Sequence, residues 1–328
     1  MIEEQLPFED VKNKIAQAET ISILSHLNPD ADTLGTSLGI YALLSKDKSK
    51  KVEIVNASNA LPMYLDFMPH YKKIKHKMDY TNSLIIACDC GSIDRLGFDL
   101  SGRDIINIDH HQSNTKYGSI NVIVPQYASA SQVAYALFDK LYPVCEEAAT
   151  CFYVALLSDT RYFTTSAVNA EVFAVSKSLV DKGAKPNEVA YHFTQRRSLA
   201  SIRILEKALA SLTLHEEAKV ATLFVTKEDI AMTGAKVSDM EGIVDYGRSL
   251  ATVEVAVFAM EIEEGVRISL RSKSADVSKV ALAFGGGGHK VAAGFTLKDL
   301  PQTQCGLQTS LDTILEKIRT LKLCSNKS

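Results

Sequence analysis

Short apolar runs alternate with helical patterns along the first half of the chain. The runs are rich in Ile, Leu and Val and have the length of buried strands; they lie at 21–24, 52–55, 83–88, 103–108 and 119–124. Segments with helical spacing lie between and after them, at 8–18, 33–44, 131–141, 147–157, 170–182 and 187–194. Strands that alternate with helices predict an α/β fold built on a doubly wound, mainly parallel sheet of five strands.

The pattern changes beyond residue 196. A long helical stretch over 198–214 precedes three segments that look like antiparallel strands, at 219–225, 252–262 and 266–271. A short helix over 276–284, a run of four glycines and a closing strand near 293–297 follow. We therefore expect a second, smaller α/β domain with a mixed or antiparallel sheet.

This change divides the chain into two domains. We place the first at 1–190, a helical linker at 191–205 and the second at 206–328. A chain of 328 residues is long enough for two domains of ordinary size.

The composition is that of an average soluble protein, with 46% hydrophobic and 23% charged residues. The net charge of −3 provides no global basic field for binding long nucleic acid. No apolar run approaches the roughly 18 residues needed to span a membrane, and the N-terminal sequence is not that of a signal peptide. The six cysteines form no C-x-x-C pattern and are interpreted as reduced thiols. We therefore expect a cytoplasmic protein without a membrane partner.

Acidic and imidazole side chains gather where the predicted strands end. They are His26, Asp30 and Asp32 after the first strand, Asp89 after the third, Asp109, His110 and His111 after the fourth, and Asp159 at the end of the helix over 147–157. The carboxyl ends of strands are where open α/β sheets bind ligands. Crowded carboxylates repel one another unless cations lie between them, and oxygen and imidazole donors suit a hard or borderline divalent ion. The pattern predicts a site for two divalent ions, whose four positive charges would balance four carboxylates.

Each of these residues has a simpler explanation when it is taken alone. Asp30 or Asp32 would cap the following helix, and Asp89 would cap a turn. His110 and His111 would be one packed and one exposed histidine. Their joint occurrence at consecutive strand ends favours the metal site.

A second group of candidate residues lies near the glycine run of the C-terminal half. Four consecutive glycines lose much conformational entropy on ordering, and one reason for them is close approach of backbone N–H groups to a phosphate. The alternative is a sharp turn between a helix and the next strand. The neighbouring Arg271 and His289 favour a binding site for phosphate and ribose. Its residues would be Arg271, Gly286, Gly287, Gly288 and His289.

These motifs resemble those of a known family. His26-x-x-x-Asp30-x-Asp32, the segment from Asp89 to Gly97, Asp109-His110-His111 and Ser158-Asp159-Thr160 are similar, in order, to the four motifs of DHH phosphoesterases. The glycine run with His289, followed by Ala292-Ala293-Gly294-Phe295, resembles the signature of the DHH-associated C-terminal domain. The resemblance covers nearly the whole chain. In size and layout it is nearest to the nanoRNase and pAp-phosphatase (NrnA-like) subgroup, with RecJ exonucleases as larger relatives.

The resemblance implies a role for each residue of the metal site. It divides the ligands between two ions: His26, Asp30 and Asp89 for one, and Asp32, Asp89, His110 and Asp159 for the other, with Asp89 bridging. The usual ion of the family is Mn²⁺, with Mg²⁺ or Co²⁺ as alternatives. His111 would face the phosphate as a charge stabiliser or proton donor, and Asp109 would orient its neighbours.

One departure from the subgroup follows the last motif. The subgroup usually carries Gly after Asp-Thr and then Phe-Arg, whereas this chain reads Arg161-Tyr162-Phe163-Thr164. We expect the guanidinium of Arg161 either to contact a substrate phosphate or to pack at the helix end.

The resemblance implies a two-metal phosphoesterase in which a metal-activated hydroxide attacks phosphorus. A cleft between the domains would suit short RNA or DNA oligonucleotides, or 3′-phosphoadenosine 5′-phosphate (pAp), rather than long nucleic acid. Three alternatives remain: a cyclic-dinucleotide phosphodiesterase acting on c-di-AMP or pApA, an inorganic pyrophosphatase, against which the glycine-rich signature argues, and a nucleotide-binding module without turnover. A homodimer is expected only by analogy.

Overall fold

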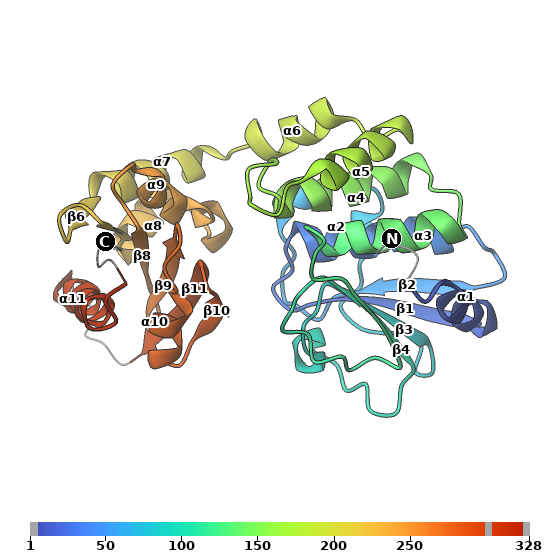
Figure 1. The fold of residues 1–328 in the computed structure, drawn as a ribbon. Helices are drawn as coiled ribbons and strands as arrows, with labels where there is room; N and C mark the ends of the chain where they lie inside the picture. Colours follow the sequence, from blue (N-terminus) through green and yellow to red (C-terminus); the bar gives the residue numbers. More distant parts are fainter. Residues whose placement is uncertain (1–5, 299–303, 324–328) are drawn as a thin grey trace. The chain divides into compact units, whose positions relative to one another are not determined.

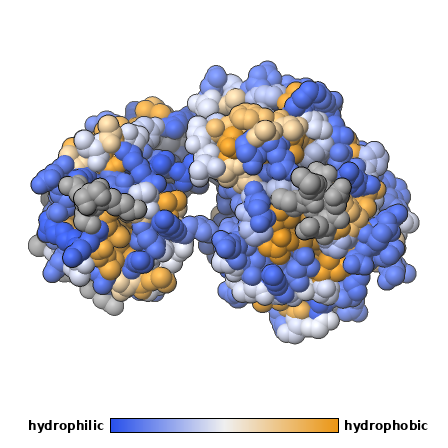
Figure 2. Space-filling model, in the orientation of Figure 1, coloured by the Kyte–Doolittle hydropathy of each residue, from blue (hydrophilic) through white to orange (hydrophobic). Residues whose placement is uncertain are grey.

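The computed structural model describes residues 6–298 and 304–323, and the chain forms two compact units, 1–196 and 197–328 (Figure 1). In the described part, no helix is both long and apolar enough to cross a membrane. Cys88, Cys90, Cys145 and Cys151 carry free thiols. Cys324 lies outside the described residues, as does the side chain of Cys305. Hydrophilic residues cover most of the surface seen in Figure 2.

A five-stranded parallel sheet forms the centre of the first unit. Its strands are β1 (Thr20–Ser25), β2 (Lys51–Val55), β3 (Leu84–Cys88), β4 (Ile105–Asp109) and β5 (Ile120–Ile123), in the order β2-β1-β3-β4-β5. Every neighbouring pair is parallel, which confirms the predicted α/β sheet. All five carboxyl ends therefore lie at one edge, where the candidate residues were expected to meet.

The helices of this unit are α1 (Phe8–Gln17), α2 (Ala31–Leu44), α3 (Ala130–Leu141), α4 (Glu146–Asp159), α5 (Ala170–Asp181) and α6 (Pro186–Thr194). Helix α2 is buried on all sides except at Tyr41, because it lies between the sheet and α4. Glycines make this close approach feasible: a Cβ on Gly35 would lie 2.6 Å from the carbonyl oxygen of Cys151. The helix that begins beside Asp30 is thereby held against the helix that ends at Asp159.

The opposite face of the sheet packs against connections rather than long helices. Leu24, Val55 and Ile85 form a second, smaller core there with Leu96 of the 3₁₀ helix η4 (Ile93–Leu96) and with Phe98. Figure 1 shows the contrast, with α2, α3 and α4 on one side of the strands and mostly loops on the other. The segment that follows Asp89 therefore packs on this second face.

The second unit contains a six-stranded mixed sheet. Its strands are β6 (Thr213–His215), β7 (Val220–Val225), β8 (Val255–Ile262), β9 (Gly265–Ser272), β10 (Gly287–His289) and β11 (Ala292–Lys298), in the order β10-β11-β9-β8-β7-β6. The hairpin of β8 and β9 is antiparallel as expected, but β7 and β8 are parallel. The antiparallel expectation for the first of these strands was wrong, because α8 (Lys227–Thr233) and α9 (Ile243–Ser249) form a crossover between β7 and β8.

Three further elements differ from the sequence-based expectation. The long helix over 198–214 is shorter: α7 spans Leu199–Ala210 and is followed by strand β6. The last two glycines of the run, Gly287 and Gly288, form the edge strand β10 with His289 rather than a turn alone. Helix α11 (Gln304–Thr320) was not predicted, although Leu307, Leu311, Ile314 and Ile318 have helical spacing and are buried in the core of this unit.

Replacing Gly35 by Ala is expected to destabilise the first unit. The substitution raises helix propensity by about 1 kcal/mol, but the new Cβ would lie 2.6 Å from the backbone of α4 and overpacking of this kind costs about 1–3 kcal/mol. Urea unfolding should therefore show a lower midpoint for Gly35→Ala. Gly91→Ala is the matched control, because nothing lies within 4 Å of its Cβ position. An unchanged or raised midpoint for Gly35→Ala would show that α2 and α4 can separate freely.

Candidate metal centre

Asp30 has two functions at the turn between β1 and α2. It is the N-cap of α2, and its Oδ1 accepts hydrogen bonds of 3.1 Å from the backbone N–H groups of Asp32 and Thr33. Its other oxygen, Oδ2, lies 3.8 Å from Nε2 of His26. The capping role and the metal-site role, which the sequence presented as alternatives, are thus taken by different atoms of one carboxylate.

Asp32 is held by the beginning of a helix that lies far away in sequence. Its Oδ2 accepts a 2.7 Å hydrogen bond from the N–H of Ala130, and its Oδ1 accepts one of 3.1 Å from Ser131, both in the first turn of α3. The same Oδ2 lies 3.8 Å from Nε2 of His110. The side chain is buried, so these backbone donors fix its direction.

Asp89 lies at the centre of the cluster, directly after β3. Its Oδ2 is 3.6 Å from Nε2 of His26, and its Oδ1 is 3.7 Å from Nε2 of His110. The residue is buried and has a left-handed backbone with φ of 53°. Among the described residues, no group donates a hydrogen bond to its Oδ1. A buried carboxylate oxygen without a donor is an unfavourable arrangement unless a cation binds it.

The two histidines present the same nitrogen to the carboxylates. Nδ1 of His26 lies 2.8 Å from the carbonyl oxygen of Leu27, and Nδ1 of His110 lies 3.2 Å from that of Tyr127. Each ring therefore donates its Nδ1–H to the backbone and directs Nε2 into the site. This is the tautomer and the orientation that a metal-ligating histidine requires.

The residues present therefore fit divalent ions. Three groups of possible ligands have donor atoms within 4.8 Å of one another: His26, Asp30 and Asp89; Asp32, His110 and Asp159; and Asp89, Asp109, His110 and His111. Nε2 of His110 also lies 3.6 Å from Oδ2 of Asp159, the last residue of α4. The structure thus brings together all six residues that the sequence suggested as ligands.

Asp109 and His111 lie beside the cluster. Oδ1 of Asp109 accepts hydrogen bonds from the backbone N–H of His110 at 2.7 Å and from Nδ1 of His111 at 2.7 Å. Its Oδ2 accepts one from the side-chain amide of Asn114. Burial raises the pKa of Asp109, but the bonds from His111 and Asn114 outweigh it and leave the pKa below its usual value. Asp109 therefore stays ionised and orients the histidine pair.

Two supporting side chains were missed in the sequence. Thr33 donates a 2.8 Å hydrogen bond to the carbonyl oxygen of Cys88 and accepts one from the N–H of His26, so it ties the end of β1 to the end of β3. Asn114 joins Asp109 to the carbonyl oxygen of Cys90. Thr33 lies within the first motif, but no pattern in the sequence distinguishes Asn114 from an ordinary loop residue.

The candidate phosphate-binding residues lie in the second unit. His289 of β10 pairs with Ala292 of β11, which pairs in turn with Arg271 of β9. Directly paired residues share a face of the sheet, so Arg271 and His289 belong to one row across three strands, about 10 Å from end to end.

The glycines in β10 and directly before it differ in the space around them. A Cβ on Gly286 would lie 2.3 Å from the carbonyl oxygen of Gly294, and one on Gly288 would lie 2.5 Å from that of Ala292. Both are therefore required by the close approach of β11. No atom of the described residues lies within 4 Å of the Cβ position of Gly287, which is exposed. Close backbone approach by a ligand is thus feasible at Gly287.

Comparison with protein families agrees with this division into two parts. Residues 20–156 match the DHH family, N-terminal domain, and residues 217–321 match the DHHA1 domain. The chain carries a DHH domain followed by a DHHA1 domain.

Similar proteins match along nearly the whole chain. The bifunctional oligoribonuclease and PAP phosphatase NrnA of Thermus thermophilus is 29% identical over 91% of this chain and 89% of its own length. The probable bifunctional oligoribonuclease and PAP phosphatase NrnA of Streptococcus mutans is 25% identical, with 90% and 96% covered. The crystal structure of an exopolyphosphatase-related protein from Bacteroides fragilis has a TM-score of 0.87 at 26% identity and covers 96% of both chains.

The segment after Asp159 in the first unit has an unusual backbone. Arg161, Tyr162 and Phe163 have φ values of 47°, 59° and 63°, all in the left-handed region. A hydrogen bond of 2.8 Å from the N–H of Tyr162 to the carbonyl oxygen of Leu157 holds this turn. Glycine adopts such a φ without strain, which explains why the resembling subgroup usually has it where this chain has Arg161. The positive charge of Arg161 also lowers the pKa of Asp159, so the two side chains lie near each other.

Crowding raises the pKa of several carboxyl groups in the DHH domain. Burial, and next the charge of Asp159, raise the pKa of Asp32 to about 7. Burial raises the pKa of Asp159 to about 6 although His110 opposes it, and burial with the charges of Asp32 and Asp30 raises that of Asp89 well above its usual value. Holding all these groups ionised therefore requires positive charge between them.

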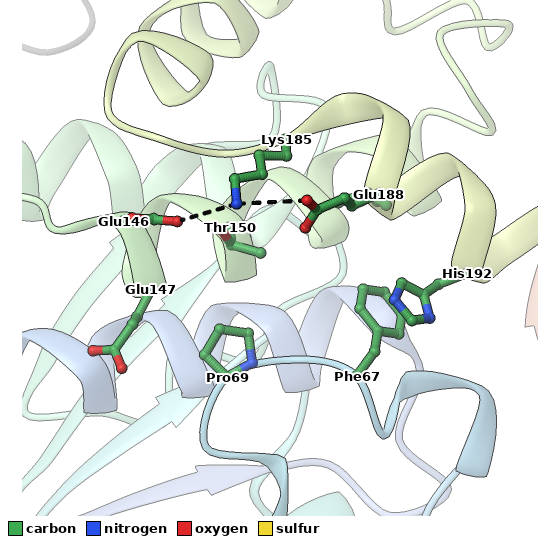
Figure 3. A pocket seen from close by; sticks show the side chains of 9 residues that line it. Phe67, Pro69, Glu146, Glu147, Thr150, Lys185, Glu188 and His192 are labelled. Atoms are coloured by element: carbon green, nitrogen blue, oxygen red, sulfur yellow. Dashed lines mark ion pairs between the residues drawn. The ribbon is translucent and has the colours of Figure 1, made fainter.

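A pocket elsewhere in the first unit contains none of the predicted site residues. It lies between α4 and α6, where Lys185 pairs with Glu146 at 3.9 Å and with Glu188 at 3.5 Å (Figure 3). The rings of Phe67 and His192 stack at one end of it, with centroids 3.9 Å apart. Lys185 is paired with the two glutamates, and Glu147 lies 3.4 Å from Nε2 of His70, so the charged groups of this pocket have partners and it does not compete with the metal centre as a candidate catalytic site.

Metal-free protein is expected to lose stability as the pH rises from about 4 to about 7. In this range the folded protein retains protons on Asp32 and Asp159, whose pKa values are raised to about 7 and about 6, while the unfolded chain has released them. Ionisation of these groups therefore favours unfolding. Thermal melting in the presence of a chelator should show a falling melting temperature, and Mn²⁺ should raise it more at about pH 8 than at about pH 5.

Two variants distinguish the pH dependence caused by the buried carboxyl groups from the effect of removing any one negative charge. Asp32→Asn should make the pH dependence shallower and the response to Mn²⁺ smaller, whereas Asp99→Asn, an exposed group bonded only to Ser101, should change neither. A melting temperature of the metal-free protein that rises with pH would contradict the prediction.

Arg161→Gly is expected to stabilise the DHH domain by about 1 kcal/mol, because the left-handed backbone costs a residue with a side chain roughly this much. Urea unfolding of the metal-free protein measures the change. Ser166→Gly, at an exposed position of the same loop whose φ is not positive, should give no stabilisation. Equal effects of the two variants would argue against strain at Arg161.

Proposed function

We propose that this chain is a two-metal phosphoesterase that hydrolyses short oligonucleotides and pAp to mononucleotides. The observation that supports this most strongly is the position of Asp89, whose two oxygens each lie near Nε2 of a different oriented histidine, His26 and His110. The similarity of the chain to NrnA proteins named as oligoribonucleases and PAP phosphatases supports the same substrate class.

The ligands divide into two sets in this proposal. His26, Asp30 and Asp89 hold one ion, and Asp32, Asp89, His110 and Asp159 hold the other. When bound, the ions would supply Lewis-acid activation of water and neutralise charge on the phosphoryl group. The mixed oxygen and imidazole set suits Mn²⁺, and Mg²⁺ or Co²⁺ are alternatives. The backbone contacts of Asp30, Asp32 and both histidines keep these groups in place before any ion or substrate binds.

His111 acts on the substrate rather than on an ion. Its Nδ1 donates a 2.7 Å hydrogen bond to the buried carboxylate of Asp109, which fixes the orientation of the ring. A ring held in this way can donate a proton or a hydrogen bond from Nε2 to a phosphoryl oxygen. Asp109 is thus a positioning residue, and Asn114 keeps it in place.

The DHHA1 domain binds the nucleotide. Arg271 and His289 supply positive charge and hydrogen-bond donors from one row of the sheet, and Gly287 lets a phosphate approach the backbone. Gly286 and Gly288 act indirectly, by allowing β10 to pair closely with β11. The net charge of −3 agrees with short substrates rather than long nucleic acid.

The Mn²⁺-loaded protein is expected to hydrolyse pAp and di- to pentaribonucleotides, and Asp89→Asn should reduce kcat/KM by more than about 100-fold. Replacing a ligand shared by both ions should reduce kcat/KM by more than the 10–100-fold typical of replacing a residue that only supports a ligand. The assay should include cyclic di-AMP and pyrophosphate, with Asp99→Asn as a matched control in the same unit.

The outcomes distinguish the alternatives. Hydrolysis of cyclic di-AMP alone would favour the cyclic-dinucleotide phosphodiesterase. Binding of nucleotides without turnover of any substrate would favour the binding module. Near wild-type hydrolysis by Asp89→Asn would reject the bridging role.

A further inference from the structure

An exposed arginine lies directly beside one of the histidines of the metal centre. Arg95 is on η4, six residues after Asp89, and its Nη2 is 3.3 Å from Nδ1 of His26. A backbone hydrogen bond of 2.7 Å from the N–H of Leu27 to the carbonyl oxygen of Arg95 joins the two segments. The backbone of Arg95 is therefore held beside the site by a main-chain contact that does not depend on its side chain, and the guanidinium lies within reach of His26.

Nδ1 of His26 carries a proton in this arrangement, so it cannot accept a hydrogen bond from the guanidinium of Arg95. Nδ1 of His26 lies closer to the carbonyl oxygen of Leu27, at 2.8 Å, and donates its proton there. With Nε2 directed at the carboxylates, Nδ1 has no lone pair to accept from Arg95. The guanidinium thus faces an N–H group, and its donors must find another acceptor or water.

No carboxylate of the described residues forms an ion pair with Arg95. Other arginines of the described chain behave differently: Arg196 pairs with Asp66 at 2.8 Å and Arg248 with Asp245 at 2.8 Å. Arg103 is instead bonded to Ser83. Arg95 therefore brings an uncompensated positive charge to the rim of the site.

The charge balance of the metal-loaded centre indicates a role for Arg95 in neutralising the phosphate of the substrate. Four carboxylates, Asp30, Asp32, Asp89 and Asp159, balance two divalent ions, so a bound phosphate ester adds one or two negative charges that nothing in the ligand sets neutralises. Arg161 lies near Asp159 on one side of the cluster. Arg95 lies beside His26 on the other.

We propose that Arg95 binds the phosphoryl group of the substrate at this centre, with its Nη donors on a non-bridging oxygen on the His26 side. The planar guanidinium is suited to phosphate because it presents parallel donors and keeps its charge. This assignment deepens the proposed function and rests on it for the identity of the substrate. The residue lies within the Asp89–Gly97 motif, but the sequence alone assigned it no role.

The test compares Arg95→Gln and Arg95→Lys with wild type in two kinds of measurement. Calorimetry gives the affinity of metal-free protein for Mn²⁺ and of Mn²⁺-loaded protein for orthophosphate, and kinetics gives kcat/KM for pAp. Arg95→Gln should weaken orthophosphate binding and kcat/KM by about 10–100-fold, the loss expected for a charge-assisted hydrogen bond, and leave Mn²⁺ affinity unchanged. Arg95→Lys keeps the positive charge but not the parallel donors of the guanidinium, so its orthophosphate affinity and kcat/KM should be intermediate.

The control removes the same charge from the same unit. Lys12 lies on α1, which leads into the amino end of β1 and therefore toward the opposite edge of the sheet, and Lys12→Gln should match wild type throughout. Urea unfolding confirms that each variant is folded.

Each result decides the assignment. Weaker Mn²⁺ binding by Arg95→Gln would mean that the arginine only positions His26, and it would overturn the proposal. Unchanged orthophosphate affinity, or no orthophosphate binding by the wild type, would also overturn it. If the wild type binds orthophosphate and Arg95→Gln does not, but pAp and oligonucleotides are not hydrolysed, Arg95 keeps its role and the proposed function fails.

Discussion

Electrostatic repulsion among four carboxylates at one edge of the parallel sheet is the constraint on which the rest of the site depends. Asp32 and Asp89 are buried, and both face other acidic groups. Left alone, such groups take up protons or separate. The fold prevents separation by attaching the carboxylates to three rigid elements, with Asp30 and Asp32 both at the beginning of α2. Asp89 follows β3, Asp32 lies in the first turn of α2 and Asp159 ends α4. Cations are then the remaining way to keep the groups charged.

The directions of the ligands are set by backbone groups rather than by other side chains. Asp30 uses one oxygen to cap α2, Asp32 is held by the first turn of α3, and each histidine donates to a carbonyl group. These contacts use helix N-termini and strand ends that the fold forms in any case. The same atoms that complete the secondary structure therefore orient the metal site. Roles that look like alternatives in the sequence, such as cap and ligand for Asp30, are compatible because a carboxylate has two oxygens.

The two arginines near the cluster, Arg161 and Arg95, lie on irregular segments rather than on strands or long helices. Arg161 lies in a left-handed turn after α4, and Arg95 lies on a 3₁₀ helix after β3. Neither segment is part of the sheet or of a long helix, so each can place a cation near the cluster without displacing a ligand. In the DHHA1 domain, the glycines are used differently: Gly286 and Gly288 permit strand pairing, and Gly287 stays open.

The sequence by itself predicted the parallel sheet and the six candidate ligands, His and Asp residues that the folded chain brings together at the carboxyl edge of that sheet. It could do so because strand length, apolar content and the residue that follows each strand are local properties. It could not show that β7 and β8 are parallel, since pairing direction depends on the path of the crossover between them. Nor could it show that Asp32 is held by Ala130, that Asn114 supports Asp109, or that Arg95 lies beside His26. These contacts join segments up to 98 residues apart, and only the packing of the folded chain brings their atoms within hydrogen-bonding distance.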